Sequence, residues 1–151
     1  MSMISASQVK ELREKTGLGL MDCKKALQEA NGDIDLAIEE LRKTSGIKAS
    51  KKSGRSAADG LIGIEMQDQN IFMVEVNCET DFVARDDSYI SFTKEVLEIY
   101  SKNPDMSLEQ LLETGIEDSR ERLVQKLGEN IIVRRMAKTD NSSTIGSYLH
   151  S

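Results

Sequence analysis

The spacing of apolar side chains changes part-way along the chain. In roughly the first 45 residues, apolar positions such as Ile34, Ile38 and Leu41 recur every three or four residues, which is the period of an amphipathic helix. From residue 61 the period becomes two, as Ile62 and Ile64 illustrate, and such alternation is typical of a β-strand with one buried face. The two periods predict an α+β fold, in which an N-terminal three-helix unit is followed by a small antiparallel sheet with helices.

Three short helices are expected in the N-terminal part. Ser5 or Ser7 caps the first helix, and the run Thr16–Gly19 ends it. A second helix covers Met21–Ala30. Asp33 caps the third helix, which is expected to end near residue 45. Short helices joined by two tight turns predict a compact bundle.

Residues 46–60 (GIKASKKSGRSAADG) combine small side chains with four basic ones and few apolar ones. This composition predicts a basic linker, in part helical, between the bundle and the rest of the chain. Two interpretations of the basic run stay open from the residues alone. It is either a solvated tether, which is the commoner case, or a contact for phosphate or an acidic partner.

Residues 61–78 predict a β-hairpin, because two alternating runs flank the polar turn Gln67–Asn70. The second strand is expected to bury one face, formed by Phe72, Val74, Val76 and Cys78.

Helices and two further strands are expected after the hairpin. Asp87 or Ser88 caps one helix, and another runs from about Glu117 to Leu127. The later apolar runs Asn130–Met136 and Thr144–Leu149 predict a third strand and the beginning of a fourth.

Charge and hydropathy exclude several classes of protein. The 151 residues carry 20 basic and 26 acidic side chains, a net charge of −6, which disfavours a general binder of nucleic acid. No apolar run approaches the roughly 20 residues of a membrane span. The first residues show no basic segment followed by an apolar one, so neither a signal nor a transit peptide is expected. These features predict a cytoplasmic protein without membrane or direct nucleic-acid partners.

The chemically reactive side chains are few and scattered. Cys23 and Cys78 lie far apart, in no metal-binding spacing, and are expected to be reduced. His150 is the single histidine, and one histidine makes neither a metal site nor a catalytic triad. No nucleophile stands beside a base, and no glycine-rich phosphate loop is present. The sequence therefore predicts no catalytic residues, no metal and no cofactor, and a protein that is not an enzyme.

Two places offer apolar side chains in polar surroundings. Leu18, Leu20 and Met21 lie in or beside a glycine-flanked loop and are expected to form a contact patch, although core packing is an equal alternative for each of them. Phe82 stands at the exit of a buried strand, next to Asp81. From the residues alone, Phe82 is either part of the core, which is the favoured interpretation, or a wedge that enters a partner.

Four ordered sequence runs cover most of the chain. They are Val9–Glu14 (VKELRE), Met21–Asp33 (MDCKKALQEANGD), Glu75–Ala84 (EVNCETDFVA) and Gly128–Arg135 (GENIIVRR). Together they resemble the N-terminal domain and the first part of the core of bacterial translation elongation factor Ts. Members of that family are guanine-nucleotide exchange factors for EF-Tu in translation elongation.

The resemblance implies three regions and two contact sites. The regions are an EF-Tu-docking bundle of the ubiquitin-associated type at 1–45, a basic linker at 46–60, and the N-terminal half of the core at 61–151. One site would displace Mg²⁺ from EF-Tu and wedge its GTPase domain apart; it comprises Thr80, Asp81, Phe82 and Val83. The other would dock on the GTPase surface and comprises Arg13, Leu20 and Met21, with Leu20 where many relatives have Met. The implied partner is EF-Tu, both GDP-bound and nucleotide-free.

The chain departs from the family at its C-terminal side, where relatives continue well past Tyr148–His150. Since short relatives pair as dimers, the resemblance also leaves a homodimer open. Two other functions compete with exchange. One is a ubiquitin-associated-like adaptor that binds a partner without exchange activity and needs only the bundle. The weaker one is a small RNA-binding protein, and this alternative rests on the basic run Lys48–Arg55 alone.

Overall fold

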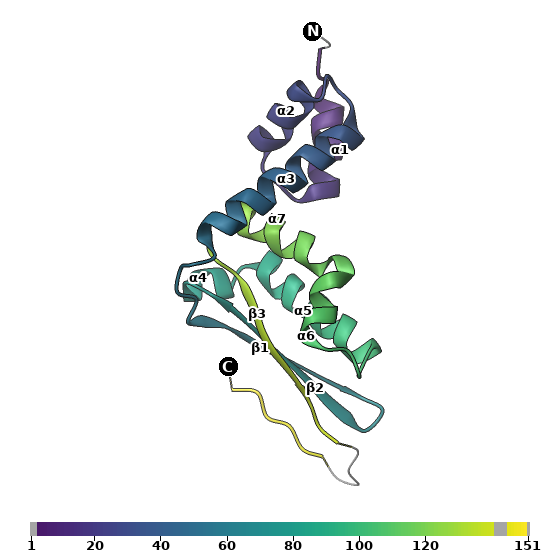
Figure 1. Cartoon of the computed structure of the whole chain (residues 1–151), viewed down its shortest axis with the longest axis vertical. Coiled ribbons are helices and arrows are strands. Elements are labelled where there is room, and N and C mark those ends of the chain that lie inside the picture. The colour runs from purple at the N-terminus through teal and green to yellow at the C-terminus, as the bar shows by residue number, and fades with distance from the viewer. Residues whose placement is uncertain (1–2, 141–144, 151) are drawn as a thin grey trace.

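The computed structural model describes residues 3–140 and 145–150 and has the α+β architecture that the two apolar periods predict (Figure 1). In chain order the elements are α1 Ala6–Thr16, α2 Leu20–Glu29, α3 Ile34–Lys52, β1 Asp59–Gln67, β2 Asn70–Cys78, α4 Asp81–Ala84, α5 Asp87–Lys102, α6 Leu108–Leu111, the π-helical turn η1 Leu112–Ile116, α7 Glu117–Leu127 and β3 Ile132–Lys138. None of the helices in the described residues is long and apolar enough to cross a membrane.

The first three helices form a bundle with its own apolar core. Ser5 begins α1 through a reciprocal capping box with Gln8, which satisfies backbone donors that the first turn leaves unpaired. Gly17 ends the helix in the left-handed conformation, at φ 70°. Leu12 and Leu27 are fully buried in the bundle. The expected three-helix bundle is therefore present.

Helix α3 is longer than the sequence indicated. It continues without a break to Lys52, so the first half of the segment expected to be a linker is helical. The small side chains there form a close-packed face: Ala49 is buried in the core of the second unit, and Ser45 donates a hydrogen bond to Gln125 Oε1 of α7 at 2.5 Å. In the sequence, these small residues favoured a linker. In the structure, they allow α3 and α7 to approach closely.

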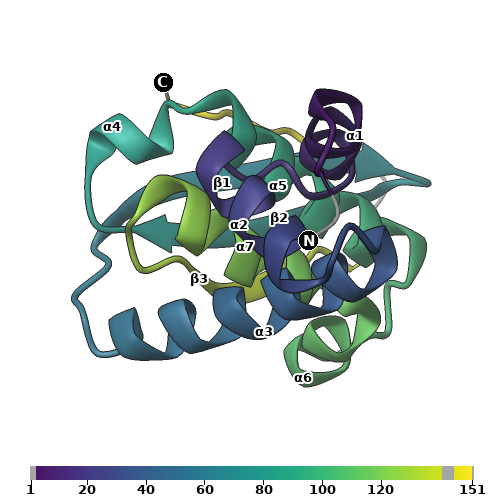
Figure 2. The same cartoon turned by 90° about the horizontal axis from the view of Figure 1, so that it is seen from above.

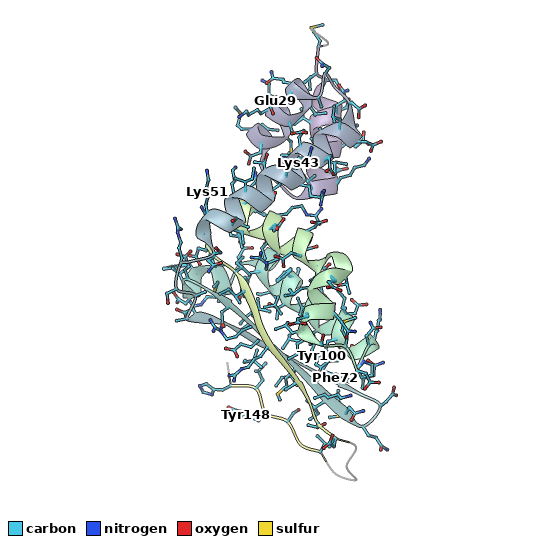
Figure 3. The ribbon with its side chains drawn as sticks, viewed as in Figure 1. Glu29, Lys43, Lys51, Phe72, Tyr100 and Tyr148 are labelled. Atoms are coloured by element: carbon cyan, nitrogen blue, oxygen red, sulfur yellow. The ribbon has the colours of Figure 1, made fainter. Side chains whose placement is uncertain are left out.

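The sheet is antiparallel, with strand order β1-β2-β3, and helices cover one of its faces (Figure 1). Phe72, Val74, Val76 and Cys78 are buried as predicted. Phe72 meets Tyr100 of α5 edge to face, with ring centroids 5.3 Å apart (Figure 3), a favourable aromatic geometry. Viewed from above, α3 runs beside α7, with α5 and the strands of the sheet beyond them (Figure 2). The second core therefore lies between the sheet and α5 and α7.

Two expectations about the secondary structure were wrong, one about a helix cap and one about a strand. Asp86, rather than Asp87 or Ser88, caps α5, because its carboxylate accepts the Ser88 backbone N–H at 2.8 Å. The expected fourth strand does not form in residues 145–149, where Tyr148 (Figure 3) and Leu149 are exposed and so form no buried strand face. Its first residue, Thr144, lies outside the described residues.

Candidate functional site

Helix α4 is one short turn directly after the central strand, and it holds Phe82 in solvent. Thr80 caps this turn by accepting the Val83 backbone N–H at 3.4 Å. The Phe82 side chain is 79% exposed, so the interpretation of Phe82 as a core residue is wrong. Asp81 is also exposed, and its carboxylate pairs with Arg85 at 3.1 Å, one helical turn later.

Of the four residues Thr80–Val83, two attach the turn to the rest of the protein and two are exposed to solvent. Val83 packs against the apolar core, and Thr80 is half-buried and used as the cap. Asp81 and Phe82 point away from the core. A large exposed aromatic ring on an attached turn is a costly use of apolar surface, and such a ring is typical of a contact for a partner.

Glu129, to which the sequence assigned no role, is hydrogen-bonded to the segment that leads into the Phe82 turn. The Glu129 carboxylate accepts hydrogen bonds from the backbone N–H groups of Glu79 and Thr80 at 2.9 and 3.0 Å and from the Thr80 hydroxyl at 2.6 Å. Glu129 belongs to the run Gly128–Arg135, about 50 positions from Thr80. The signal for its contribution lay in that run, but only the fold brings the two segments together.

The second predicted contact site lies on the bundle. Met21 is 72% exposed and Leu20 is 54% exposed at the beginning of α2, and Arg13 is exposed on α1. Leu18, which was expected to belong to the same patch, is only 2% exposed and packs in the bundle core. The remaining patch of Leu20 and Met21 is well separated from α4, with the length of α3 between them (Figure 1).

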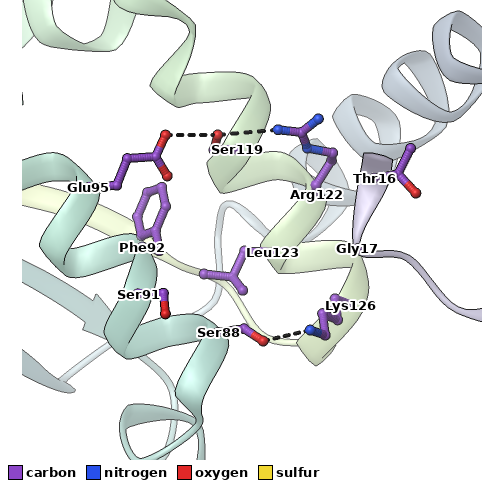
Figure 4. A pocket seen from close by; sticks show the side chains of 10 residues that line it. All are labelled: Thr16, Gly17, Ser88, Ser91, Phe92, Glu95, Ser119, Arg122, Leu123 and Lys126. Atoms are coloured by element: carbon purple, nitrogen blue, oxygen red, sulfur yellow. Dashed lines mark hydrogen bonds between the residues drawn. The ribbon is translucent and has the colours of Figure 1, made fainter. Parts of the chain in front are cut away.

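A cleft of about 360 Å³ lies where the end of α1 faces α5 and α7 (Figure 4). Lys126 donates a hydrogen bond to the Ser88 hydroxyl at 2.6 Å across this cleft. Ser119 lies between Glu95 and Arg122, with hydrogen bonds of 3.4 and 3.3 Å. None of the residues predicted for the two contact sites lines the cleft.

The reactive groups of the described residues are not gathered into a site. Cys23 and Cys78 are buried free thiols, and burial raises the pKa of each above its usual value of 9.0. Within residues 3–140 and 145–150, no group of three or more His, Cys, Asp and Glu side chains is placed to hold a metal ion.

Comparison with known proteins agrees with the sequence runs. The family model for elongation factor Ts matches residues 79–151. Elongation factor Ts of Marinobacter nauticus is 52% identical over 153 residues, which cover 100% of this chain and 53% of the relative. Those of Hahella chejuensis and Saccharophagus degradans are 53% and 50% identical, over 99% and 98% of this chain and 53% and 52% of the relatives.

The chain belongs to the elongation factor Ts family. It spans about half the length of the curated relatives it matches. In this member of the elongation factor Ts family, two of the family-like runs are neighbours in space. Glu75–Ala84 includes the end of β2, and Gly128–Arg135 includes the beginning of β3, which pairs with β2 at Asn77 and Ile132. The structure therefore joins the run that carries Phe82 to the run that carries Glu129.

Proposed function

We propose that the chain is a guanine-nucleotide exchange factor for EF-Tu in the bacterial cytoplasm, and that it promotes GDP release without covalent chemistry. The bundle docks on the GTPase, and the α4 turn enters the GTPase domain, where it displaces Mg²⁺ and separates packed elements. The observation that carries this proposal is the exposure of Phe82 on a turn that hydrogen bonds hold firmly.

Thermodynamic linkage explains how such binding releases a nucleotide. A factor that lowers the affinity of a GTPase for GDP binds the nucleotide-free form more tightly by the same ratio. A bound Mg²⁺ ion is the largest local charge at a phosphate site, so its loss weakens GDP binding. Packed interfaces change between discrete arrangements. An inserted aromatic ring therefore favours the separated arrangement.

The exposed Asp81 contributes a negative charge next to the proposed wedge. Its pair with Arg85 is exposed to solvent, and exposed ion pairs are worth about 0–1 kcal/mol. The Asp81 carboxylate is therefore free to exchange its partner when α4 meets the GTPase. We expect this carboxylate to repel the phosphate groups of the bound nucleotide and so to disfavour GDP binding.

Replacing Phe82 by Ala tests the wedge. Since the ring is exposed, Phe82→Ala should leave the melting curve unchanged, while stimulated release of fluorescent GDP from EF-Tu falls by at least about tenfold. Affinity for nucleotide-free EF-Tu should fall less than the release rate does, because the bundle is untouched. The matched control is Phe92→Ala: Phe92 is buried in the core, so this change should cost about 3–5 kcal/mol of stability.

The adaptor without exchange activity remains the alternative, because Leu20 and Met21 are exposed whether or not exchange follows docking. The two functions differ in one result. If the wild-type chain binds EF-Tu and leaves the rate of GDP release unchanged, the adaptor is correct and the wedge is not.

A further inference from the structure

Glu129 occupies the turn between α7 and β3, and its carboxylate is fully engaged by the segment that leads into α4. Oε2 accepts the two backbone N–H groups of Glu79 and Thr80, and Oε1 accepts the Thr80 hydroxyl. All three distances are between 2.6 and 3.0 Å. Hydrogen bonds to an ionised carboxylate are roughly twice as strong as those between neutral groups.

The arrangement is reciprocal. Glu79 accepts the Asn130 backbone N–H on its own carboxylate oxygen Oε1 at 2.7 Å. Each of the two segments, 79–80 and 129–130, therefore contributes one carboxylate, and that carboxylate accepts hydrogen bonds from the backbone of the other segment. We call these four residues the Glu129 clasp.

The clasp also reaches the end of the helix that comes from the bundle. The buried Asn130 side chain donates hydrogen bonds to the backbone carbonyls of Arg55 at 2.8 Å and Ser53 at 3.4 Å. The Arg55 guanidinium lies 3.5 Å from Glu79 Oε1. The clasp therefore connects three segments that are far apart in the sequence: the exit of α3, the exit of β2 and the entry to β3.

The α4 turn depends on these bonds for its direction. It has only four residues, and one helical turn has little stability of its own. The Thr80 hydroxyl has two roles, since it donates to Glu129 and accepts the Val83 N–H. Loss of Glu129 frees this hydroxyl and two backbone N–H groups directly before Asp81 and Phe82.

We infer that Glu129 is a positioning residue for Phe82: it fixes the direction of α4 so that the aromatic ring meets the GTPase in one orientation. This inference rests on the proposed exchange function. Glu129 itself is not assigned a contact with EF-Tu. Functional groups that are misplaced by about 1 Å act much less effectively. A turn that is present but free to reorient is therefore expected to be a poor wedge.

The test compares Glu129→Ala and Glu129→Gln with the wild type in GDP release from EF-Tu, over a range of concentrations of the chain. Glu129→Ala should lower the maximal release rate by about tenfold or more and change the half-saturating concentration by less than about threefold. Glu129→Gln should recover part of the loss, because its carbonyl still accepts the N–H groups and its amide donates to the Thr80 hydroxyl. Glu113→Ala, an exposed change in η1, is the matched control and should have no effect.

A second comparison separates positioning from general destabilisation. If Glu129 acts through Phe82, Glu129→Ala should cause no further loss when it is added to Phe82→Ala. An additional loss of similar size in that background overturns the inference. So does a fall in affinity that equals the fall in maximal rate, or a Glu129→Gln variant that folds and is as poor as Glu129→Ala.

Amide hydrogen exchange distinguishes failure of this inference from failure of the proposed function. In the chain alone, Glu129→Ala should speed exchange at the Glu79 and Thr80 amides by at least about tenfold and leave the central amides of β2 unchanged. If the wild-type chain fails to stimulate GDP release from EF-Tu but Glu129→Ala speeds exchange at the two amides, the clasp is real and the exchange function is wrong. Unchanged exchange at both amides shows that Glu129 does not hold the turn.

Discussion

Gly60 stands at a place in β1 where the neighbouring strand leaves no room for a side chain. Its φ is +150°, and a Cβ built there would lie 2.0 Å from the Val76 carbonyl oxygen. Gly60→Ala should therefore lower the free energy of unfolding by at least about 2 kcal/mol. The control is Gly54→Ala, where a Cβ meets no atom within 4 Å and stability should change by less than about 1 kcal/mol. Urea unfolding of both variants checks this, and equal effects would contradict it.

The buried thiols give stability a pH dependence with a definite sign. Burial raises the pKa of Cys23 and of Cys78 above the usual 9.0, so the folded state holds each proton more tightly than the unfolded state. Their contribution is complete below about pH 9 and is lost as pH rises further, at no more than about 1.4 kcal/mol per pH unit for each thiol. Unfolding free energies at several pH values should fall above pH 9. In the Cys23→Ala, Cys78→Ala double variant that fall should be smaller, and an identical slope would show that the thiols are not its source.

At the scale of elements, α2 and the loop before it place two neighbouring apolar residues in opposite environments. Leu18 is buried in the bundle, whereas Met21, three positions later, points into solvent. The glycine at φ 70° before Leu18 reverses the chain so that Leu18 turns inward. The start of α2 then presents Leu20 and Met21 on its outer side.

Substitutions at these two positions should separate docking from folding. Met21→Asp should weaken binding to EF-Tu by about 1–3 kcal/mol, with an unchanged far-UV spectrum, because the side chain makes no core contact. Leu18→Ala should instead destabilise the bundle by about 2–5 kcal/mol. Calorimetric titration and thermal melts measure the two effects. If Met21→Asp binds EF-Tu as the wild type does, the patch is not the docking site.

At the scale of the whole molecule, α3 belongs to both cores. Leu41 packs in the bundle, and Ala49 packs in the core beneath the sheet. The elongated molecule in Figure 1 is therefore joined by a continuous helix rather than by a flexible linker. A helix shared in this way connects the unit that carries the exposed Leu20 and Met21 to the unit that carries the Phe82 turn.

Breaking α3 between its two packed halves should uncouple the ends. Ile47 is 58% exposed in this stretch, and proline there removes a helical hydrogen bond and clashes with the preceding turn, at a cost of about 3 kcal/mol or more. The Ile47→Pro variant should melt in two transitions. It should stimulate GDP release from EF-Tu only slowly, although its bundle still binds EF-Tu. Ile47→Ala should behave as the wild type. A single unshifted melt for Ile47→Pro would show that α3 does not connect the two units.

Much of the fold followed from local sequence patterns. The period of apolar residues predicted the three-helix bundle, the hairpin and the buried face of β2, because each depends on side chains only two to four positions apart. Ser5, Asp33 and Gly128 mark helix ends for the same reason, since a cap uses atoms of its own turn.

Tertiary structure decided what these patterns left open. The segment around Ala49 was left open between a tether and a contact segment, and it forms the end of α3, where Ala49 packs in the second core. Phe82 proved to be exposed because its turn is attached through Thr80 and Glu129, two residues 49 positions apart. Burial and long-range hydrogen bonds depend on which distant segments meet, and a local pattern carries no information about that. The sequence thus determined most of the elements and the family, whereas the fold determined which of the predicted residues are exposed to solvent and which hydrogen bonds attach their segments.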